Sequence, residues 1–294
     1  MSHMFRGTGV ALVTPFREDE SVDYPALEQV IDHVITGGVD YLVALGTTGE
    51  TPTLTAEEKS AVLAFIIEKS NNRVPVVAGV GGNNTKEVVA QVKELPEGVA
   101  GILSVSPYYN KPTQAGIFSH FAAIAEATEL PIILYNVPGR TAGNMLPGTT
   151  LRLANAYKNI VAIKEASGNM AQCMELVQHK PEGFAVLSGD DNLVLAQIAI
   201  GMDGVISVAA NAYAKDFTGM VNAALAGDFA EARRLHYRLL TGMDLLFVEG
   251  NPAGVKYVLS LMGICKNVLR LPLVPVSSEV ASNTALFLST LQQS

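Results

Sequence analysis

Short apolar runs rich in β-branched residues recur along most of the chain. They are continuous and do not alternate with polar residues, which is typical of strands buried on both faces of a parallel sheet. Amphipathic segments with helical periodicity lie between them. The eight runs are residues 9–14, 41–45, 74–78, 101–105, 131–135, 160–163, 185–188 and 204–208.

Helix-start signals fit this alternation of strand and helix. Thr55 with Glu58 predicts a capping box that opens a helix through residue 67, and Asn84 with Glu87 predicts another that continues to residue 95. Eight β-then-α units match a (β/α)8 TIM barrel, and a doubly wound sheet is the competing fold. The glycines at 79–84 do not complete G-x-G-x-x-G, so the pattern favours the barrel.

The strand pattern stops near Gly227, and residues 228–247, 254–262 and 278–291 look helical. We therefore expect a (β/α)8 catalytic domain over residues 4–227. A C-terminal helical region over residues 228–294 should follow as an appendage without a core of its own.

Composition narrows the class of protein. The chain has 294 residues, 49% of them hydrophobic, and a net charge of −8 without a basic stripe, which suits a large core and gives no support to nucleic-acid binding. No apolar run is long enough for a membrane helix. Cys173 and Cys265 are far apart in sequence, which suits a reducing cytoplasm. The first three residues, Met-Ser-His, resemble a vector remnant.

Candidate chemistry should lie at the C-terminal ends of the strands, where the active sites of such barrels form. Lys164 stands in the apolar run 160–166, an expensive place for an ammonium. Desolvation favours the neutral amine, which attack on a carbonyl requires. The alternative is a structural lysine that pairs with a buried carboxylate or extends out of the strand end.

Other strand-end residues have both a chemical and a structural interpretation. Tyr135 could move protons or be an ordinary core tyrosine. The turn with Thr47 and Thr48 could bind a carboxylate through N–H and hydroxyl groups or simply be a tight turn. Arg140 could bind a carboxylate or be a solvated charge. The acidic pair 190–191 fits a strand-end turn with a helix cap better than catalysis. No histidines cluster with carboxylates or cysteines at metal-ligand spacing, so no metal is predicted, and no cofactor is predicted either.

Five motifs taken together resemble the dihydrodipicolinate synthase family, also called 4-hydroxy-tetrahydrodipicolinate synthases, from residue 5 to the end of the chain. They are G-T-T-G-E at 46–50, S-P-Y-Y-N-K-P-T at 106–113, Y-N-V-P-G-R-T at 135–141, I-K-E-A-S-G-N at 163–169 and S-G-D-D at 188–191.

The resemblance implies a Schiff-base enzyme of the diaminopimelate route to lysine. It would condense pyruvate with aspartate-4-semialdehyde. Lys164 would be the nucleophile, Tyr135 the proton donor and acceptor, and Thr47 and Tyr109 the rest of a proton relay. The second tyrosine would reach in from a neighbouring subunit of a homotetramer. The residues implied in substrate binding are Thr48, Ile206, Arg140 and Gly189.

The resemblance also implies an effector site for lysine. Lysine-inhibited bacterial members carry histidines where this chain has Ala56 and Lys59. Ala56 offers no contact, and Lys59 places a positive charge beside a cationic ligand, so we expect weak or absent feedback by lysine. The other positions that match this site are Thr51, Asn83, Glu87 and Tyr108.

Rival functions stay open at this point. An N-acetylneuraminate lyase or a 4-hydroxy-2-oxoglutarate-type class I aldolase would share the lysine and the tyrosine. Sialic-acid lyases typically read G-S-T-G-E where this chain reads G-T-T-G-E, and Arg140 favours an acidic second substrate over a sugar. A barrel that binds a keto acid as a non-catalytic sensor is the alternative from a different class.

Overall fold

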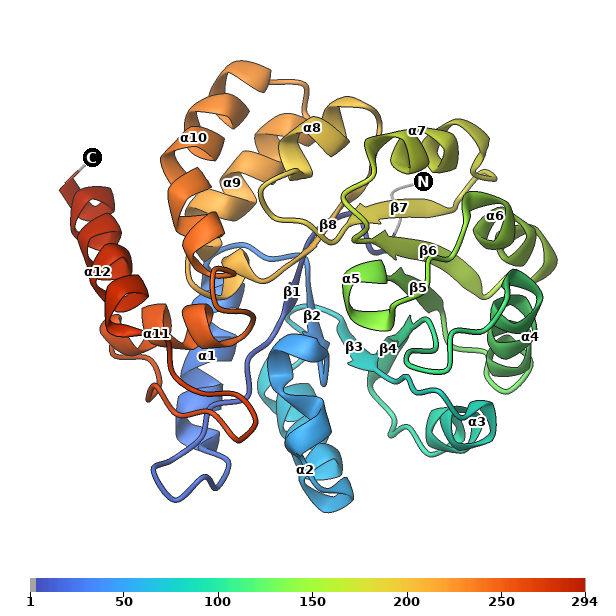
Figure 1. Cartoon of the computed structure of the whole chain (residues 1–294), viewed down its shortest axis with the longest axis horizontal. Helices are drawn as coiled ribbons and strands as arrows, with labels where there is room; N and C mark the ends of the chain where they lie inside the picture. Colours follow the sequence, from blue (N-terminus) through green and yellow to red (C-terminus); the bar gives the residue numbers. More distant parts are fainter. Residues whose placement is uncertain (1–3, 294) are drawn as a thin grey trace.

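Eight parallel strands close into a barrel in which each strand pairs with the next along the chain and β8 pairs with β1 (Figure 1). The computed structural model describes residues 4–293, so the proposed vector remnant lies outside the described residues. The predicted TIM barrel is confirmed. The strands are β1 (Gly7–Ala11), β2 (Tyr41–Ala44), β3 (Val76–Gly79), β4 (Val99–Val105), β5 (Ile132–Asn136), β6 (Ile160–Glu165), β7 (Ala185–Ser188) and β8 (Gly204–Ser207).

Helices form the outer ring of the barrel and the C-terminal region (Figure 1). The α-helices are α1 (Tyr24–Thr36), α2 (Ala56–Ser70), α3 (Thr85–Lys93), α4 (Gln114–Ala125), α5 (Pro138–Thr141), α6 (Pro147–Ala156), α7 (Met170–His179), α8 (Val194–Ala199), α9 (Ala214–Leu225), α10 (Phe229–Leu245), α11 (Ala253–Leu261) and α12 (Ser278–Gln293). Three short 3-10 helices are η1 (Thr47–Gly49), η2 (Thr51–Thr53) and η3 (Ala209–Asn211).

One of the two predicted capping boxes forms completely. At the start of α2, Thr55 and Glu58 exchange both capping hydrogen bonds. At the start of α3, the Asn84 side chain accepts a hydrogen bond from the Lys86 N–H, but its amide donates to the Glu87 carboxylate at 2.8 Å. Asn84 is therefore the expected N-cap, and Glu87 binds its side chain and not its backbone.

The barrel interior and the strand–helix layer form two separate hydrophobic clusters. The interior cluster includes Ile133 and Tyr135 of β5, Ala162 of β6 and Ile206 of β8. Because side chains alternate across a strand, residues two apart share a face, and so the side chain of Lys164 follows that of Ala162 into the barrel. The larger outer cluster fills the space between the strands and the helices.

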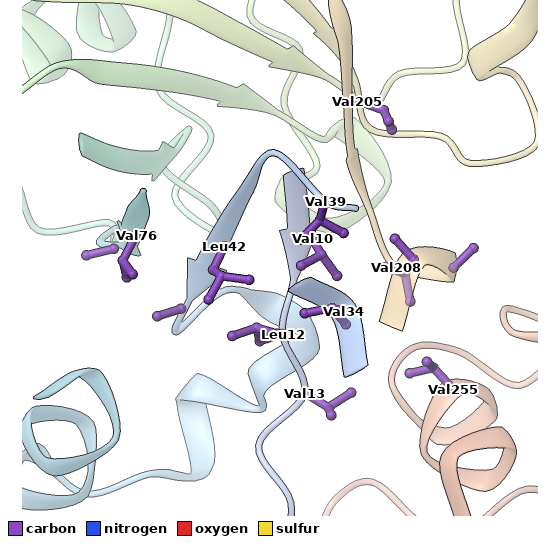
Figure 2. Close-up of a cluster of buried hydrophobic side chains, with 14 of the residues drawn as sticks. Val10, Leu12, Val13, Val34, Val39, Leu42, Val76, Val205, Val208 and Val255 are labelled. Carbon is purple, nitrogen blue, oxygen red and sulfur yellow. The ribbon is translucent and has the colours of Figure 1, made fainter. Parts of the chain in front are cut away.

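The C-terminal helices pack on the barrel as an extension of the outer layer. Helix α10 packs against α9, and α12 packs against α10 and α11. Val255 of α11 belongs to the same cluster as Val13 and Val208, as Figure 2 shows. No helix within residues 4–293 is both long and apolar enough to cross a membrane.

Candidate active site

Lys164 lies inside the barrel at the C-terminal end of β6 and is only 5% exposed. Its strand partner in the sheet register is Tyr135 of β5. The Lys164 Nζ lies 4.5 Å from the centre of the Tyr135 ring. The predicted nucleophile and the predicted proton carrier are therefore direct neighbours, with the amine over the aromatic face.

The charge partners of the buried lysines differ. Lys256 is fully buried and forms an ion pair with the carboxylate of Glu50, which is also buried. Within residues 4–293 no ion pair holds the Lys164 amine. The structural interpretation of Lys164 as half of a buried ion pair therefore does not hold.

Gly189 and Ile206 shape the space around this amine. A Cβ on Gly189 would lie 3.1 Å from Lys164 Cε and 2.5 Å from Ala166 Cβ. A side chain at position 189 would therefore clash with Ala166 and press against the end of the Lys164 side chain. Ile206 is fully buried in the interior cluster and forms part of its apolar wall.

The two acidic residues after β7 have different surroundings. Asp191 is buried and accepts hydrogen bonds from the Val208 and Ala209 N–H groups, at 3.1 and 2.8 Å, at the start of η3. The helix that follows it in the chain, α8, has no side-chain cap, so the cap favoured from sequence does not form there. Asp190 has a buried Oδ2 without a hydrogen-bond partner among the described residues. Burial raises the pKa of Asp190 to about 6, and the charge of Lys164 opposes this rise.

The turn after β2 presents one threonine inward and one outward. Thr48 is 2% exposed, and its Oγ1 accepts a hydrogen bond of 3.0 Å from the Asn251 Nδ2. Thr47 is exposed and begins η1, and its carbonyl oxygen accepts a hydrogen bond of 3.1 Å from the Glu50 N–H. A residue from the C-terminal region thus contacts the turn, which was not predicted from the sequence.

Arg140 and Tyr109 lie at the surface of the single chain. Arg140 is exposed on α5, which follows directly after β5. Tyr109 is 86% exposed, and its backbone has a φ of 71°, in the left-handed region. No hydrogen bond or ring contact among the described residues joins either side chain to Lys164.

A buried network on the outer face of β5 and β6 fixes the segment that carries Arg140. Asn136 and Glu165 are register partners, and the Asn136 Nδ2 donates to both Glu165 carboxylate oxygens at 3.1 and 3.0 Å. Glu165 also accepts from Gln172 Nε2 at 2.8 Å. The Met145 N–H donates to Asn136 Oδ1 at 2.9 Å. These bonds tie both flanks of α5 to the barrel.

Known proteins match this chain over nearly its whole length. A family model described as the dihydrodipicolinate synthetase family matches residues 4–291. The chain belongs to this family. A curated relative from Flavobacterium psychrophilum, named 4-hydroxy-tetrahydrodipicolinate synthase, is 51% identical over 290 residues, which cover 98% of this chain and 99% of the relative.

Solved structures of the dihydrodipicolinate synthetase family show the same fold. One is the dihydrodipicolinate synthase from Acinetobacter baumannii complexed with pyruvate, with 40% identity and a TM-score of 0.95, covering 98% of this chain and 99% of that one. Another is the synthase from Cyanidioschyzon merolae with lysine bound, with 37% identity and a TM-score of 0.96, covering 99% of each chain.

The positions predicted from the family to bind an effector fall into two groups. Asn83 and Tyr108 are joined, because the Asn83 Nδ2 donates to the Tyr108 carbonyl oxygen at 3.3 Å. Glu87 is exposed on α3 close by in sequence. Thr51 lies in η2, with Ala56 and Lys59 on the first turn of α2. No hydrogen bond or ion pair among the described residues joins the two groups.

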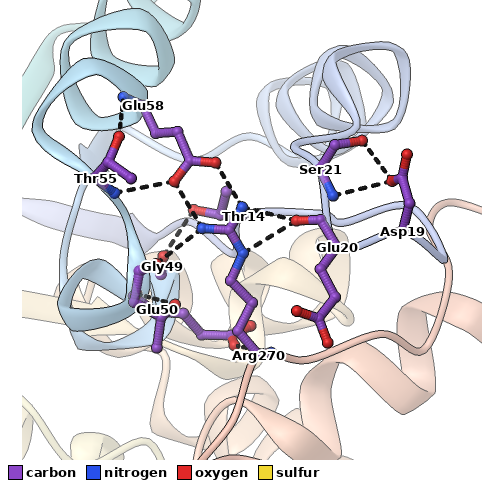
Figure 3. A network of polar contacts seen from close by, with 10 residues as sticks. Thr14, Asp19, Glu20, Ser21, Gly49, Glu50, Thr55, Glu58 and Arg270 are labelled. Carbon is purple, nitrogen blue, oxygen red and sulfur yellow. Dashed lines mark hydrogen bonds and ion pairs between the residues drawn. The ribbon is translucent and has the colours of Figure 1, made fainter.

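The residues that support the G-T-T-G-E turn were not predicted from the sequence. Glu50 was noted only as part of that motif, yet it forms an ion pair with Lys256 and accepts a hydrogen bond from the Arg270 N–H at 3.1 Å. Figure 3 shows Arg270 also bound to Glu58. A signal was present, since Lys256 interrupts an apolar helix just as Lys164 interrupts an apolar strand. No group of three or more His, Cys, Asp and Glu in residues 4–293 is placed to hold a metal ion.

Proposed function

We propose that the protein condenses pyruvate with aspartate-4-semialdehyde to give 4-hydroxy-tetrahydrodipicolinate, in the diaminopimelate route to lysine. The observation that carries the proposal is the placement of Lys164. Its amine lies inside the barrel at the C-terminal end of β6, over the ring of Tyr135 and without a carboxylate partner among the described residues. Membership of the dihydrodipicolinate synthetase family supports the same reaction.

The proposed reaction begins with attack of the Lys164 amine on the C2 carbonyl of pyruvate. The carbinolamine loses water to give the Schiff base, and loss of a methyl proton gives the enamine. The enamine carbon then attacks the aldehyde carbon of the semialdehyde, which forms the new carbon–carbon bond. The semialdehyde amine displaces Lys164 from C2, closes the ring and frees the enzyme. Tyr135 is the proposed proton donor and acceptor, with Thr47 and Tyr109 completing its relay.

Two anionic substrates need separate anchors. We assign the carboxylate of pyruvate to the turn that holds Thr48, beside the apolar wall of Ile206. Arg140, exposed on α5 at the mouth, is the proposed anchor for the carboxylate of the semialdehyde. Gly189 is the proposed backbone contact, and a side chain there would press against Ala166 and Lys164.

The proposal includes a homotetramer in the cytoplasm, built as a dimer of dimers. Tyr109 supports assembly because it is 86% exposed in the single chain and yet belongs to the proposed relay. A tyrosine from a partner subunit would complete each site. The free cysteines of the described chain, Cys173 and Cys265, are both buried, which fits the reducing compartment expected from sequence.

Feedback by lysine is proposed to be weak or absent in this protein. The related synthase from Cyanidioschyzon merolae has lysine bound in its structure. In this chain Ala56 is exposed and lacks a polar side chain, and Lys59 would repel a cationic ligand. Submillimolar lysine should leave the initial rate unchanged, and clear inhibition in that range would contradict the proposal.

The function is tested by offering the competing substrates in parallel. The protein should turn over pyruvate with aspartate-4-semialdehyde, and it should not cleave N-acetylneuraminate or 4-hydroxy-2-oxoglutarate at a comparable kcat/KM. Replacement of Lys164 by Ala should abolish turnover, while the conservative surface change Lys158→Arg should not alter it. Cleavage of sialic acid without condensation of the semialdehyde would assign the chain to the lyase branch instead.

A further inference from the structure

The buried hydroxyl of Thr48 receives a hydrogen bond from outside the barrel. The Asn251 Nδ2, on the loop between α10 and α11, donates to the Thr48 Oγ1 at 3.0 Å. A hydroxyl has one proton to donate and lone pairs that accept. Because the amide already occupies an acceptor position on Oγ1, the Thr48 hydroxyl proton remains available to another acceptor.

We propose that Asn251 is a positioning residue that sets the Thr48 hydroxyl as a hydrogen-bond donor to the carboxylate of the 2-oxo acid. The inference rests on the proposed function, in which the turn around Thr48 holds that carboxylate. An anionic acceptor makes a strong hydrogen bond with a preorganised donor. Asn251 acts through Thr48 and so changes carboxylate recognition without touching the reacting carbonyl.

The other end of the Asn251 side chain argues against a purely structural role. Asn251 is 7% exposed, and its Oδ1 is buried without a hydrogen-bond partner among the described residues. Leaving a buried acceptor unpaired costs free energy, and most buried amides avoid it. A side chain kept only for packing would not require an amide here. The cost is consistent with retention of the amide for its bond to Thr48.

A buried ion pair holds the Asn251 loop against the turn. Lys256, five residues further along, forms its ion pair with Glu50, and its Nζ also donates to the Val268 carbonyl oxygen at 2.9 Å. Glu50 itself ends η1, two residues after Thr48, in a left-handed conformation with a φ of 53°. The turn and the C-terminal region are thus bound together next to the Asn251–Thr48 contact.

A second anchor, Arg270, joins the same two segments (Figure 3). Arg270 binds both carboxylate oxygens of Glu58, at 2.7 and 2.5 Å, and its Nη1 donates to the Thr53 carbonyl oxygen at 2.9 Å. Its backbone N–H donates to Glu50. Rigid support of this kind is what a donor must have if its direction is to be fixed before substrate arrives.

The test measures adduct formation on Lys164 with sodium cyanoborohydride, following intact mass as the ketone concentration is varied. Asn251→Ala should raise the pyruvate concentration that gives half-maximal trapping by about tenfold, as expected for loss of one hydrogen bond that supports a charged contact. Asn251→Asp, of the same shape, should raise it further because it places a carboxylate beside a carboxylate. With acetone, which has no carboxylate, every variant should match the unchanged protein.

Asn192→Ala is the matched control. The Asn192 side chain also ties the C-terminal region to the barrel, by donating to Asp244 Oδ1 at 3.1 Å, but it does not touch Thr48. The pyruvate concentration that gives half-maximal trapping should be unchanged in the Asn192→Ala variant. In a double-mutant cycle, Asn251→Ala should add little to the loss caused by Thr48→Val. Thermal unfolding confirms that each variant is folded. If Asn251→Ala does not fold, the Asn251→Asp variant is compared with the unchanged protein instead.

Two results would overturn the role of Asn251. One is an unchanged half-saturation for pyruvate in both Asn251 variants. The other is an equal loss with pyruvate and with acetone, which would mean that the residue only stabilises the fold. A failure of the unchanged protein to form any pyruvate adduct on Lys164 is a different result, because it would contradict the proposed function itself.

Discussion

Lys164 and Lys256 are both buried, but their partners give them different chemistry. The Lys256 ammonium has a carboxylate and a backbone carbonyl as fixed partners, and it lies 4.1 Å from the centre of the Phe16 ring. Burial lowers the pKa of Lys256, whereas the Glu50 charge opposes that change. The Lys164 amine lies over Tyr135 inside the barrel, and no ion pair among the described residues holds it. A reactive amine needs freedom from a fixed charge partner, and only Lys164 of this pair has it.

Asp190 should make stability depend on pH. Burial raises its pKa from 3.8 to about 6, so the folded protein holds this proton more tightly than the unfolded chain does. The associated stability is fully present below pH 3.8 and is lost as pH rises to about 6. Asp190→Asn should therefore raise the free energy of unfolding above pH 6, by at most about 3 kcal/mol, and give no gain near pH 3.8.

Urea denaturation of the unchanged protein and the Asp190→Asn variant across this pH range measures the effect. The difference between their free energies of unfolding should increase as pH rises and become constant above the pKa of Asp190. A constant difference at all pH values would show that the buried Asp190 carboxyl is not the group responsible.

At the scale of elements, the C-terminal helices do more than cover the barrel. Helix α11 contributes Lys256 to the support of the turn after β2, and the following segment contributes Arg270. Removing one partner of a buried ion pair leaves the other charge without compensation in a low-dielectric interior. Lys256→Met should therefore lower the free energy of unfolding by about 3–5 kcal/mol.

The double variant Glu50→Gln with Lys256→Met is the matched comparison, because it removes both charges and keeps similar side-chain volumes. It should be more stable than the Lys256→Met variant in the same denaturation experiment. If the loss of unfolding free energy in the double variant equals the sum of the losses in the two single variants, the two charges do not act as a pair and the proposed support of the turn is wrong.

Much of the fold could be predicted because its signals are local. All eight strands overlap the apolar runs, and the capping box at Thr55 marked the start of α2. Lys164 and Tyr135 could be chosen because parallel strands bring their C-terminal ends together. Asn251 could not be placed, because its contact with Thr48 joins positions 203 residues apart and no periodicity encodes it. Lys256 gave the same signal as Lys164, and only the tertiary structure separates their roles.

For the whole molecule, the decisive prediction concerns which subunit supplies Tyr109. If it acts in a partner's site, a dimer of one Lys164→Ala chain and one Tyr109→Phe chain holds one complete site. Each variant alone should be nearly inactive, and the turnover rate of the Tyr109→Phe variant should be lower than that of the unchanged protein by about a hundredfold or more. Equal mixing with free exchange of subunits should restore activity to about one quarter of that of the unchanged protein.

Subunits are mixed, allowed to exchange and assayed with both substrates, and sedimentation reports whether tetramers form. Native mass spectrometry of the mixture, in which the two variant chains differ in mass, serves as the control for exchange. Tyr109 acts within its own chain, and the proposed assembly role is wrong, if the two inactive variants exchange subunits but recover no activity.

The role of Lys164 as the nucleophile is tested most directly by the mass of the protein after reaction with pyruvate and borohydride, followed by mapping of the modified peptide. We expect one reduced pyruvyl group per chain, carried on Lys164, and none in the Lys164→Ala variant. The absence of an adduct would favour a keto-acid sensor, and an adduct on Lys256 would show that the wrong buried lysine has been assigned as the nucleophile.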